Sequence, residues 1–465
     1  MKLAIRNIRL MNLVLIFSMM SCEDFVEVGV PAHKIASGSV FTNDETAIST
    51  LTGVYYELFN ADFSGGWSYS VTVLADLSAD ILQPINPEST TYGELYQNNI
   101  TPANAPNLRL WSSAYNIIYM ANAILEGLEG SDGLTLETKN RLEGGALFVR
   151  ALTYFHLVNI YGEVPLVLST DYRINALIGR DGTGSVNDQI VSDLERAMDL
   201  MDTEYLDGER THINKLAVTA FLARVHLYHE NWARAENLSN EVISQTSVYT
   251  LLEDLDQVFL ANSREAIWQL SPIGSGNSTT ATNEGQVFVA TARTSIKLTE
   301  DFVGSMYAND RRTSHWIGHF TDQTGNFYFP YKYKDRSSNG NITEYSMVLR
   351  LAEQYLIRAE ARAMQEKLPA AIADVDRIRT RAGLEPIADI DPGIDREALL
   401  DLIMEERKKE LFAEWGHRWL DLKRTGRATE VLGAIKPLWQ DTDLLYPIPE
   451  EERMKNPNLD QNDGY

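Results

Sequence analysis

The chain has 465 residues, of which 44% are hydrophobic, so it can bury a sizeable core and is not disordered as a whole. Its 65 acidic residues outnumber its 41 basic residues, which gives a formal net charge of −24 and argues against nucleic acid as a partner. This length fits one large domain or two to three ordinary ones.

The first 21 residues differ in character from the rest of the chain. Lys2, Arg6 and Arg9 form a positive region without an acidic residue, and a short apolar run over residues 10–20 follows it. That run is too short to span a bilayer, which takes about 20 apolar residues. We therefore expect residues 1–21 to be a secretory signal peptide that is removed from the mature protein.

The only cysteine of the sequence, Cys22, lies where such a signal is cleaved, with the small residue Ser21 before it. A buried structural cysteine is the alternative interpretation. The position instead predicts that Cys22 becomes the lipidated first residue of a bacterial lipoprotein. A single acyl chain anchors only marginally, at about 0.8 kcal/mol per buried CH₂, so a stable anchor takes several chains. A lipidated Cys22 leaves no thiol for an internal disulfide, and the fold then depends on the size of its core.

Helical patterns dominate from about Leu108 onward, which predicts a mainly α fold. Helices with an apolar stripe or an apolar circumference are expected at residues 111–128, 139–160, 185–201, 214–229, 232–244, 346–364, 368–382 and 396–415. Ser185 with Asp188 indicates an N-cap for the third of them.

Two of these helix pairs share one pattern at a constant offset of 136 residues, as between Ala223 and Ala359. The matching positions are Ala223, Leu227, Tyr228, Trp232, Ala235 and Val242 in the first pair and Ala359, Ala363, Met364, Leu368, Ala371 and Ile378 in the second. Small residues where two helices cross, with a large apolar residue opening the second helix, resemble tetratricopeptide-type hairpins. Because the copies are not contiguous, they do not form a simple solenoid.

Two regions, about 60–106 and 251–345, are irregular and rich in Gly, Ser, Thr, Asn and aromatic residues. Their short alternating runs, such as residues 266–270 and 285–289, are predicted as strands between long loops. Long loops on a helical scaffold are usually functional or disordered, and the aromatic content argues against disorder.

Motifs in several parts of the chain resemble one family. They are Arg150-Ala151 with Tyr154-Phe155, Tyr161-Gly162-Glu163-Val164-Pro165-Leu166-Val167, Asp193-Leu194 with Ala197, Glu405-Glu406-Arg407 through Glu410-Leu411, Glu414, Arg418-Trp419, Asp421-Leu422 and Arg424, and Tyr446-Pro447-Ile448-Pro449 followed by Asn456-Pro457, Gln461-Asn462 and Gly464-Tyr465. In this order they resemble the SusD/RagB family of outer-membrane nutrient-binding lipoproteins. Gly144-Gly145 departs from the family pattern, at about 1 kcal/mol for each glycine against alanine, and close helix packing would explain it.

The resemblance implies one domain over residues 22–465, with about four tetratricopeptide-like hairpins and a face of irregular loops. It implies a lipid-anchored position on the cell surface, above a TonB-dependent transporter of the SusC type that receives the captured nutrient. Most relatives are expected to bind glycans and some to bind peptides, so a peptide-binding, RagB-like function is the alternative.

The charged residues of the family motifs are expected to be structural. Glu406, Arg407, Glu410, Arg418 and Asp421 lie at helical spacings, where they can pair on neighbouring turns or tie the helix to the C-terminal tail.

No catalytic pattern of the HExxH, P-loop, GxSxG or GxGxxG type occurs in the sequence. Paired acids such as Asp76 and Asp80 could perform acid–base work on a glycosidic bond, but so acidic a chain contains such pairs by chance. Residues 181–188 lack the full acidic spacing of a calcium loop. We therefore expect no enzymatic activity, no cofactor and no metal.

The aromatic residues of the two irregular regions are the remaining candidates for a binding site. A pyranose ring stacks on tryptophan or tyrosine, while its hydroxyls need polar partners. Trp67, between Gly66 and Tyr69, is the first candidate for such a platform, and Trp316 beside Arg312 is the second, with a core position as the alternative for both. The predicted ligand-binding residues are Trp67, Tyr69, Asp76, Asp80, Tyr92, Tyr96, Arg312 and Trp316. The tryptophans expected in the core are Trp111, Trp232, Trp268, Trp415 and Trp419.

Overall fold

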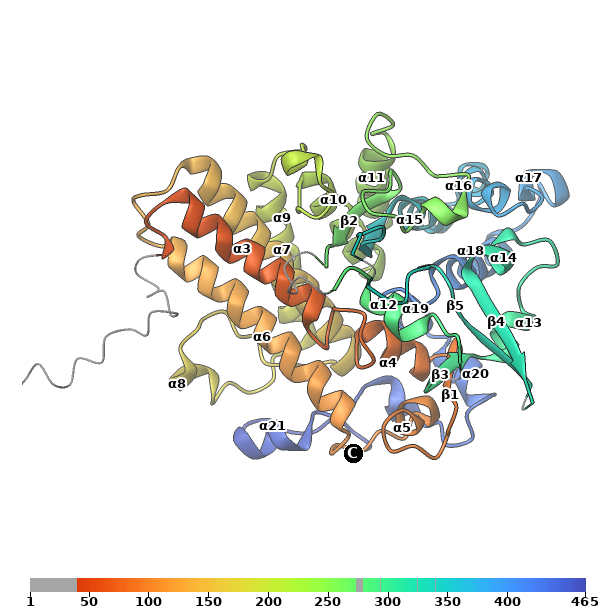
Figure 1. Ribbon diagram of the computed structural model, residues 1–465, viewed down its shortest axis with the longest axis horizontal. Coiled ribbons are helices and arrows are strands. Elements are labelled where there is room, and N and C mark those ends of the chain that lie inside the picture. The colour runs from red at the N-terminus through yellow and green to blue at the C-terminus, as the bar shows by residue number, and fades with distance from the viewer. Residues whose placement is uncertain (1–39, 273–278, 293, 324, 339) are drawn as a thin grey trace, which may run out of the picture.

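The computed structural model describes residues 40–272, 279–292, 294–323, 325–338 and 340–465 (Figure 1). The predicted signal peptide and Cys22 lie outside the described residues.

Long helices form the scaffold of the molecule. They are α3 (Asp44–Asn60), α6 (Ala105–Leu128), α7 (Leu136–Tyr161), α9 (Thr183–Leu200), α10 (Lys215–Tyr228), α11 (Trp232–Ile243), α15 (Leu351–Met364), α16 (Leu368–Arg381) and α18 (Arg396–Leu411). Side chains at the N-caps Asn43, Asn104, Thr135 and Asn214 accept a hydrogen bond from the backbone N–H three residues further on.

Shorter elements connect and cover the scaffold. The short helices are α4 (Val71–Ser78), α5 (Gly93–Gln97), α8 (Tyr172–Asn175), α12 (Asn283–Phe288), α13 (Glu300–Gly304), α14 (Arg311–Trp316), α17 (Ile387–Ile390), α19 (His417–Arg424), α20 (Ala428–Gly433) and α21 (Glu450–Lys455). The strands form three antiparallel pairs, β1 (Leu82–Pro84) with β3 (Ile296–Leu298), β2 (Ala266–Leu270) with β6 (Ser346–Arg350), and β4 (Ile317–Asp322) with β5 (Gly325–Pro330).

The prediction of a mainly α fold is confirmed, and so is the internal repeat. The pair α10 and α11 and the pair α15 and α16 begin at positions that differ by 136 residues, Lys215 with Leu351 and Trp232 with Leu368. The alanines at the helix crossings, Ala223 and Ala359 among them, have no exposed surface. Even the turn is repeated, because Glu230 and Glu366 both adopt a positive φ, of 56° and 60°.

Helix α7 lies in the centre of the N-terminal half, between α6 and α9, and is buried around most of its circumference (Figure 1). A Cβ on Gly144 would lie 2.7 Å from Sδ of Met201, and one on Gly145 would lie 2.6 Å from a methyl carbon of Leu51. The glycine pair therefore permits the close helix packing expected from the sequence.

Three local predictions are wrong. Residues 285–289, predicted as a strand, are the end of α12 and its C-cap Val289, because the Thr282 side chain accepts a hydrogen bond from the Gly285 N–H and starts a helix. Ser346–Arg350 is strand β6, buried throughout its length, and a short buried run cannot be assigned from periodicity alone. Helix α9 begins after Gly182, so Ser185 is not its N-cap.

A buried cluster of charges joins the region 251–345 to the scaffold. Its members, almost without exposed surface, are Glu265, Asp310, Arg312, Lys332, Arg350, Arg379, Arg381, Glu406, Glu410 and Glu414. Glu410 is the centre, since its carboxylate pairs with Arg350 at 2.6 Å, with Arg312 at 3.3 Å and with Arg381. Burial alone would raise the pKa of Glu410, but these arginines hold it well below its usual value. The predicted structural role of the motif charges is confirmed for Glu406 and Glu410.

Helix α4 is held by segments from the C-terminal part of the chain. The Ala413 N–H donates to Oδ2 of Asp76 at 2.8 Å, and the Trp415 N–H donates to Oγ1 of Thr72 at 3.0 Å. The Tyr446 hydroxyl donates to the Leu74 carbonyl oxygen at 3.0 Å. The position of α4, and of the loop that precedes it, therefore depends on residues far along the sequence.

Candidate functional site

An open hollow lies where the chain passes from α3 to α4. Its volume is about 340 Å³, and it is lined by Asn60, Asp62, Trp67, Ser68, Tyr69 and Tyr92. Trp67, Tyr69 and Tyr92 are each partly buried, so every ring presents some surface to solvent. The structure thus brings together three of the predicted aromatic residues with an amide, a carboxylate and a hydroxyl.

The rings of the hollow are close to one another and to a cation. The centroids of Tyr69 and Tyr92 are 6.3 Å apart at an interplanar angle of 44°. The guanidinium carbon of Arg109 lies 5.3 Å from the Tyr69 centroid, and its Nη1 lies 3.5 Å from Oδ2 of Asp62. Burial raises the pKa of Tyr92, so its hydroxyl stays neutral at physiological pH and can donate as well as accept hydrogen bonds.

The loop that carries Trp67 is fixed by a side chain from the second irregular region. Nδ2 of Asn283 donates to the carbonyl oxygens of Phe59 and Gly65, each at 2.7 Å. Within the loop, the Val71 N–H donates to the Phe63 carbonyl oxygen at 3.0 Å. Both ends of the turn are therefore held before any ligand arrives, which lowers the ordering cost of binding.

Two glycines permit this turn. A Cβ on Gly65 would lie 2.3 Å from the Phe59 carbonyl oxygen, and one on Gly66, whose φ is +74°, would lie 2.3 Å from the carboxyl carbon of Glu284. Only glycine fits both positions without movement of the backbone or of Glu284.

The Glu284 carboxyl beneath Gly66 is buried, and burial raises its pKa to about 7. Its Oε1 is hydrogen bonded to the Ser346 hydroxyl. A raised pKa means that the folded protein binds the proton more tightly than the unfolded chain, so this contribution to stability is present below about pH 4.5 and lost as the pH rises through 7.

We therefore expect the Glu284→Gln protein to become more stable than wild type as the pH rises from 5 to 8. At pH 8 the difference in the free energy of unfolding is expected to reach about 3 kcal/mol. Urea denaturation of both proteins at four pH values across this range measures the difference in their free energies of unfolding. The contributions of the other titrating groups cancel in that difference. An offset between the two proteins that stays constant from pH 5 to pH 8 would contradict the assignment.

The remaining predicted residues divide between a second pocket and the core. Asp80 and Tyr96 line a pocket of about 500 Å³ beside α5, together with Ala79, Gln83, Lys297, Thr299, Glu300, Asp301, Phe302, Lys408, Val431, Ile435 and Lys436. Both carboxylate oxygens of Asp80 are engaged, with Arg418 at 2.8 Å and with Lys408 at 2.8 Å. Burial raises its pKa, but these two cations overcome that effect and hold it well below its usual value. Asp80 therefore positions its neighbours rather than offering a free acceptor.

Three predicted ligand-binding residues are corrected. Trp316 and Arg312 have no exposed surface, since Trp316 donates its ring N–H to the Leu255 carbonyl oxygen at 3.1 Å and Arg312 belongs to the buried charge cluster. Asp76 is 1% exposed, and burial raises its pKa to about 8. None of the three presents a surface to a ligand. Trp111, Trp268, Trp415 and Trp419 are buried as predicted, whereas Trp232 is partly exposed.

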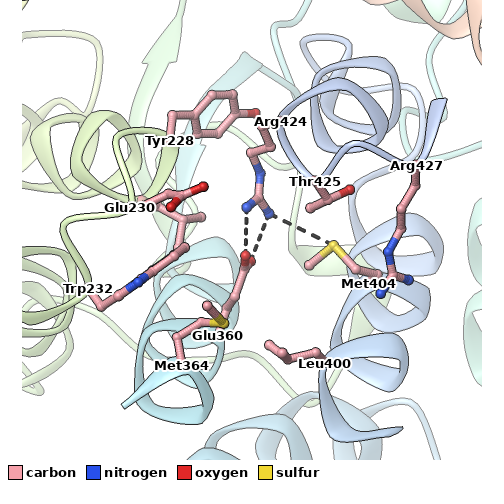
Figure 2. Close-up of a pocket in the computed structure, with 11 residues that line it drawn as sticks. Tyr228, Glu230, Trp232, Glu360, Met364, Leu400, Met404, Arg424, Thr425 and Arg427 are labelled. Carbon is pink, nitrogen blue, oxygen red and sulfur yellow. Dashed lines mark hydrogen bonds and ion pairs between the residues drawn. The ribbon is translucent and has the colours of Figure 1, made fainter. Parts of the chain in front are cut away.

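A further hollow of about 250 Å³ lies between the scaffold helices and has a different character. It is lined by Leu227, Tyr228, Glu230, Trp232, Glu360, Met364, Leu400, Met404, Arg424, Thr425 and Arg427. Figure 2 shows the Arg424 guanidinium directed at Glu360, which it meets through two nitrogens at 2.6 and 2.7 Å. Arg424 and Glu360 satisfy each other there, and Tyr228, Glu230, Thr425 and Arg427 also line the wall. Unlike the hollow at Trp67, this hollow contains none of the predicted ligand-binding residues.

Comparison with known proteins identifies the family. A family model described as starch-binding and associating with the outer membrane matches residues 70–227, and a model of the SusD family matches residues 307–444. The SusD-like protein P25 of Formosa agariphila is 27% identical, with 99% of this chain and 98% of that protein covered. The chain belongs to the SusD/RagB family. A second SusD-like protein of the same organism, P2, is 28% identical over 97% of this chain and 98% of its own length.

Solved structures share the fold of this SusD/RagB protein. A SusD superfamily protein from Bacteroides vulgatus has a TM-score of 0.80 at 20% identity, with 92% of this chain and 100% of that chain covered. A laminarin-binding SusD-like protein has a TM-score of 0.75 at 22% identity, with 91% and 100% covered. Among the residues that the structure describes, no helix combines the length and the apolar character that crossing a membrane takes.

The sequence did not identify the polar residues that line the hollow at Trp67 in this SusD/RagB protein. Asn60 is the last residue of α3, a helix that was not predicted, and Asp62 lies two residues beyond it. Ser68 lies between the two predicted aromatic residues. Arg109 reaches Tyr69 from α6, across 40 residues of sequence. The polar neighbours of Trp67 were a local signal that could have found Ser68 and Asp62, but nothing local indicates Arg109.

Proposed function

We propose that this protein is a cell-surface lipoprotein that captures an oligosaccharide or polysaccharide in the hollow at Trp67. The observation that carries the proposal is the combination of three partly exposed rings with polar groups at their edges in a loop that is already fixed. Flat rings match the C–H faces of a pyranose, and the surrounding amide, carboxylate and guanidinium match its hydroxyls. The laminarin-binding function of a protein with the same fold supports a glycan ligand.

We further propose that the captured glycan passes to a TonB-dependent transporter of the SusC type, and that a lipid on Cys22 holds the protein at the outer membrane. Membership of the SusD family, whose proteins in general work with SusC transporters, supports the transporter partner. The position of Cys22 directly after the predicted signal peptide supports the lipid anchor. Family members are binding proteins, so we propose no enzymatic step. Replacing Cys22 by serine is expected to remove the protein from the outer-membrane fraction, which cell fractionation with immunoblotting measures. Retention of Cys22→Ser in that fraction would contradict lipid anchoring.

The test of glycan capture is native affinity electrophoresis of the protein starting at Glu23. The gels contain laminarin, amylopectin, xylan, pectin or alginate, and serum albumin serves as the non-binding control. We expect retardation in at least one of these gels. If none retards the protein, glycan capture is contradicted for this panel, and calorimetry with oligopeptides tests the alternative of peptide capture. A peptide would favour unpaired strand edges and apolar pockets over flat rings.

A further inference from the structure

The hollow at Trp67 and the pocket at Asp80 share one helix. Tyr92 is the N-cap of α5 and lines the hollow, whereas Tyr96 lies one turn further on and lines the pocket. The Tyr96 N–H donates to the Tyr92 carbonyl oxygen at 2.9 Å, and Tyr92 itself has helical backbone angles. Side chains at positions i and i+4 lie on the same face of a helix, about 6 Å apart along its axis.

Trp67, Tyr69 and Tyr92 line the hollow, and Tyr96 lies one helical turn beyond Tyr92 and lines the pocket. Figure 1 shows α5 beside β1. Tyr96 is partly buried, and Nζ of Lys436 lies 5.5 Å from its ring centroid. Lys436 donates to the Leu77 and Ser78 carbonyl oxygens and to Asn98, so the wall behind Tyr96 is fixed as well.

The rim of the pocket carries polar groups that reach solvent. Gln83 projects from β1 and Lys297 from β3, at positions that are paired in the antiparallel register. Both are partly buried, and Asp301 on α13 is exposed. An amide, an ammonium and a carboxylate around a tyrosine ring repeat the chemistry of the hollow at Trp67, one helical turn further along α5.

We propose that the pocket at Tyr96 is a second sugar subsite, and that the ligand is a glycan chain of several units that lies along α5 and occupies both subsites. The inference rests on the proposed glycan capture and adds to it a requirement for chain length. A ligand of one or two sugar units fits within one subsite, whereas a longer chain gains the contacts of both. Asp80 acts as a positioning residue, because its pairs with Lys408 and Arg418 fix the floor of the second subsite.

The experiment compares the retarding polysaccharide of the gel panel with its own disaccharide, by calorimetry on wild type, Tyr96→Ala and Gln83→Ala. We expect Tyr96→Ala to weaken polysaccharide binding about tenfold and Gln83→Ala to weaken it less, while the affinity for the disaccharide stays unchanged. Tyr172→Ala, on the exposed surface of α8, is the matched control with no expected effect on either ligand. Thermal unfolding of each variant shows that it is folded.

Polysaccharide binding that is unchanged in both Tyr96→Ala and Gln83→Ala overturns the second subsite, even where Trp67→Ala abolishes binding. Equal losses for the polysaccharide and the disaccharide also overturn it, since they place both ligands in one site. If Tyr96→Ala does not fold, Gln83→Ala alone decides. Failure of the wild-type protein to bind any polysaccharide is a different result, because it removes the proposed function itself.

Discussion

Replacing Glu410 by glutamine is expected to lower the free energy of unfolding by about 3–5 kcal/mol, because it removes one charge from a buried cluster and leaves its partners uncompensated. Arg350 and Arg381 both pair with Glu410, and neither has access to solvent. Glutamine keeps the shape of the side chain, so the loss measures the charge rather than a cavity. Urea denaturation followed by tryptophan fluorescence measures this change.

Asp401 on the same helix provides the matched control. Its side chain is 63% exposed and pairs with Arg427, whose side chain is 37% exposed. Exposed pairs of this kind contribute about 0–1 kcal/mol, so Asp401→Asn is expected to change stability little. A Glu410→Gln protein as stable as Asp401→Asn would show that the cluster does not hold the region 251–345 to the scaffold.

Replacing Trp67 by alanine is expected to weaken glycan binding about 30-fold or more, since a central aromatic contact contributes about 2 kcal/mol. The unfolding midpoint is expected to change little, because Trp67 is partly exposed and the turn around it is held by Asn283. Affinity electrophoresis with the retarding polysaccharide and a thermal melt measure the two quantities.

Two further variants serve as controls for the Trp67→Ala protein. Trp67→Phe keeps a flat ring and is expected to retain part of the affinity, whereas Tyr172→Ala removes an aromatic ring that is 77% exposed outside the hollow and is expected to leave binding unchanged. Wild-type affinity in Trp67→Ala would place the glycan elsewhere on the surface.

The scaffold was largely predictable from the sequence because its signal is local and repeated. The alanines of the two hairpins, such as Ala223 and Ala359, mark helix crossings directly. The short elements were harder, since the apolar run of β6 leads directly into helix α15 and no turn residue separates them. There the pairing with β2, 76 or more residues earlier in the sequence, decides the conformation.

The residues of the candidate site were likewise predictable only in part from the local sequence. Trp67 and Trp316 have similar polar neighbours in the sequence, yet one lines a hollow and the other is completely buried. The difference is made by distant residues, because Leu255 and Lys332 enclose Trp316. Asp76 and Asp80, one turn apart, likewise differ through their partners Ala413 and Arg418. Local sequence supplied the candidates, and only tertiary contacts could separate them.

The attachment of α4 to the C-terminal part of the chain has a kinetic consequence. The contacts of Asp76 with Ala413 and of Leu74 with Tyr446 join residues that are 337 and 372 positions apart. Loops of such length close slowly, and contacts of high sequence separation delay folding. The hairpins can form from neighbouring segments, whereas the contacts of α4 can form only after the C-terminal part of the chain has reached it. The loop that carries Trp67 is therefore expected to be among the last parts of the protein to reach its final position, after most of the helix content has formed.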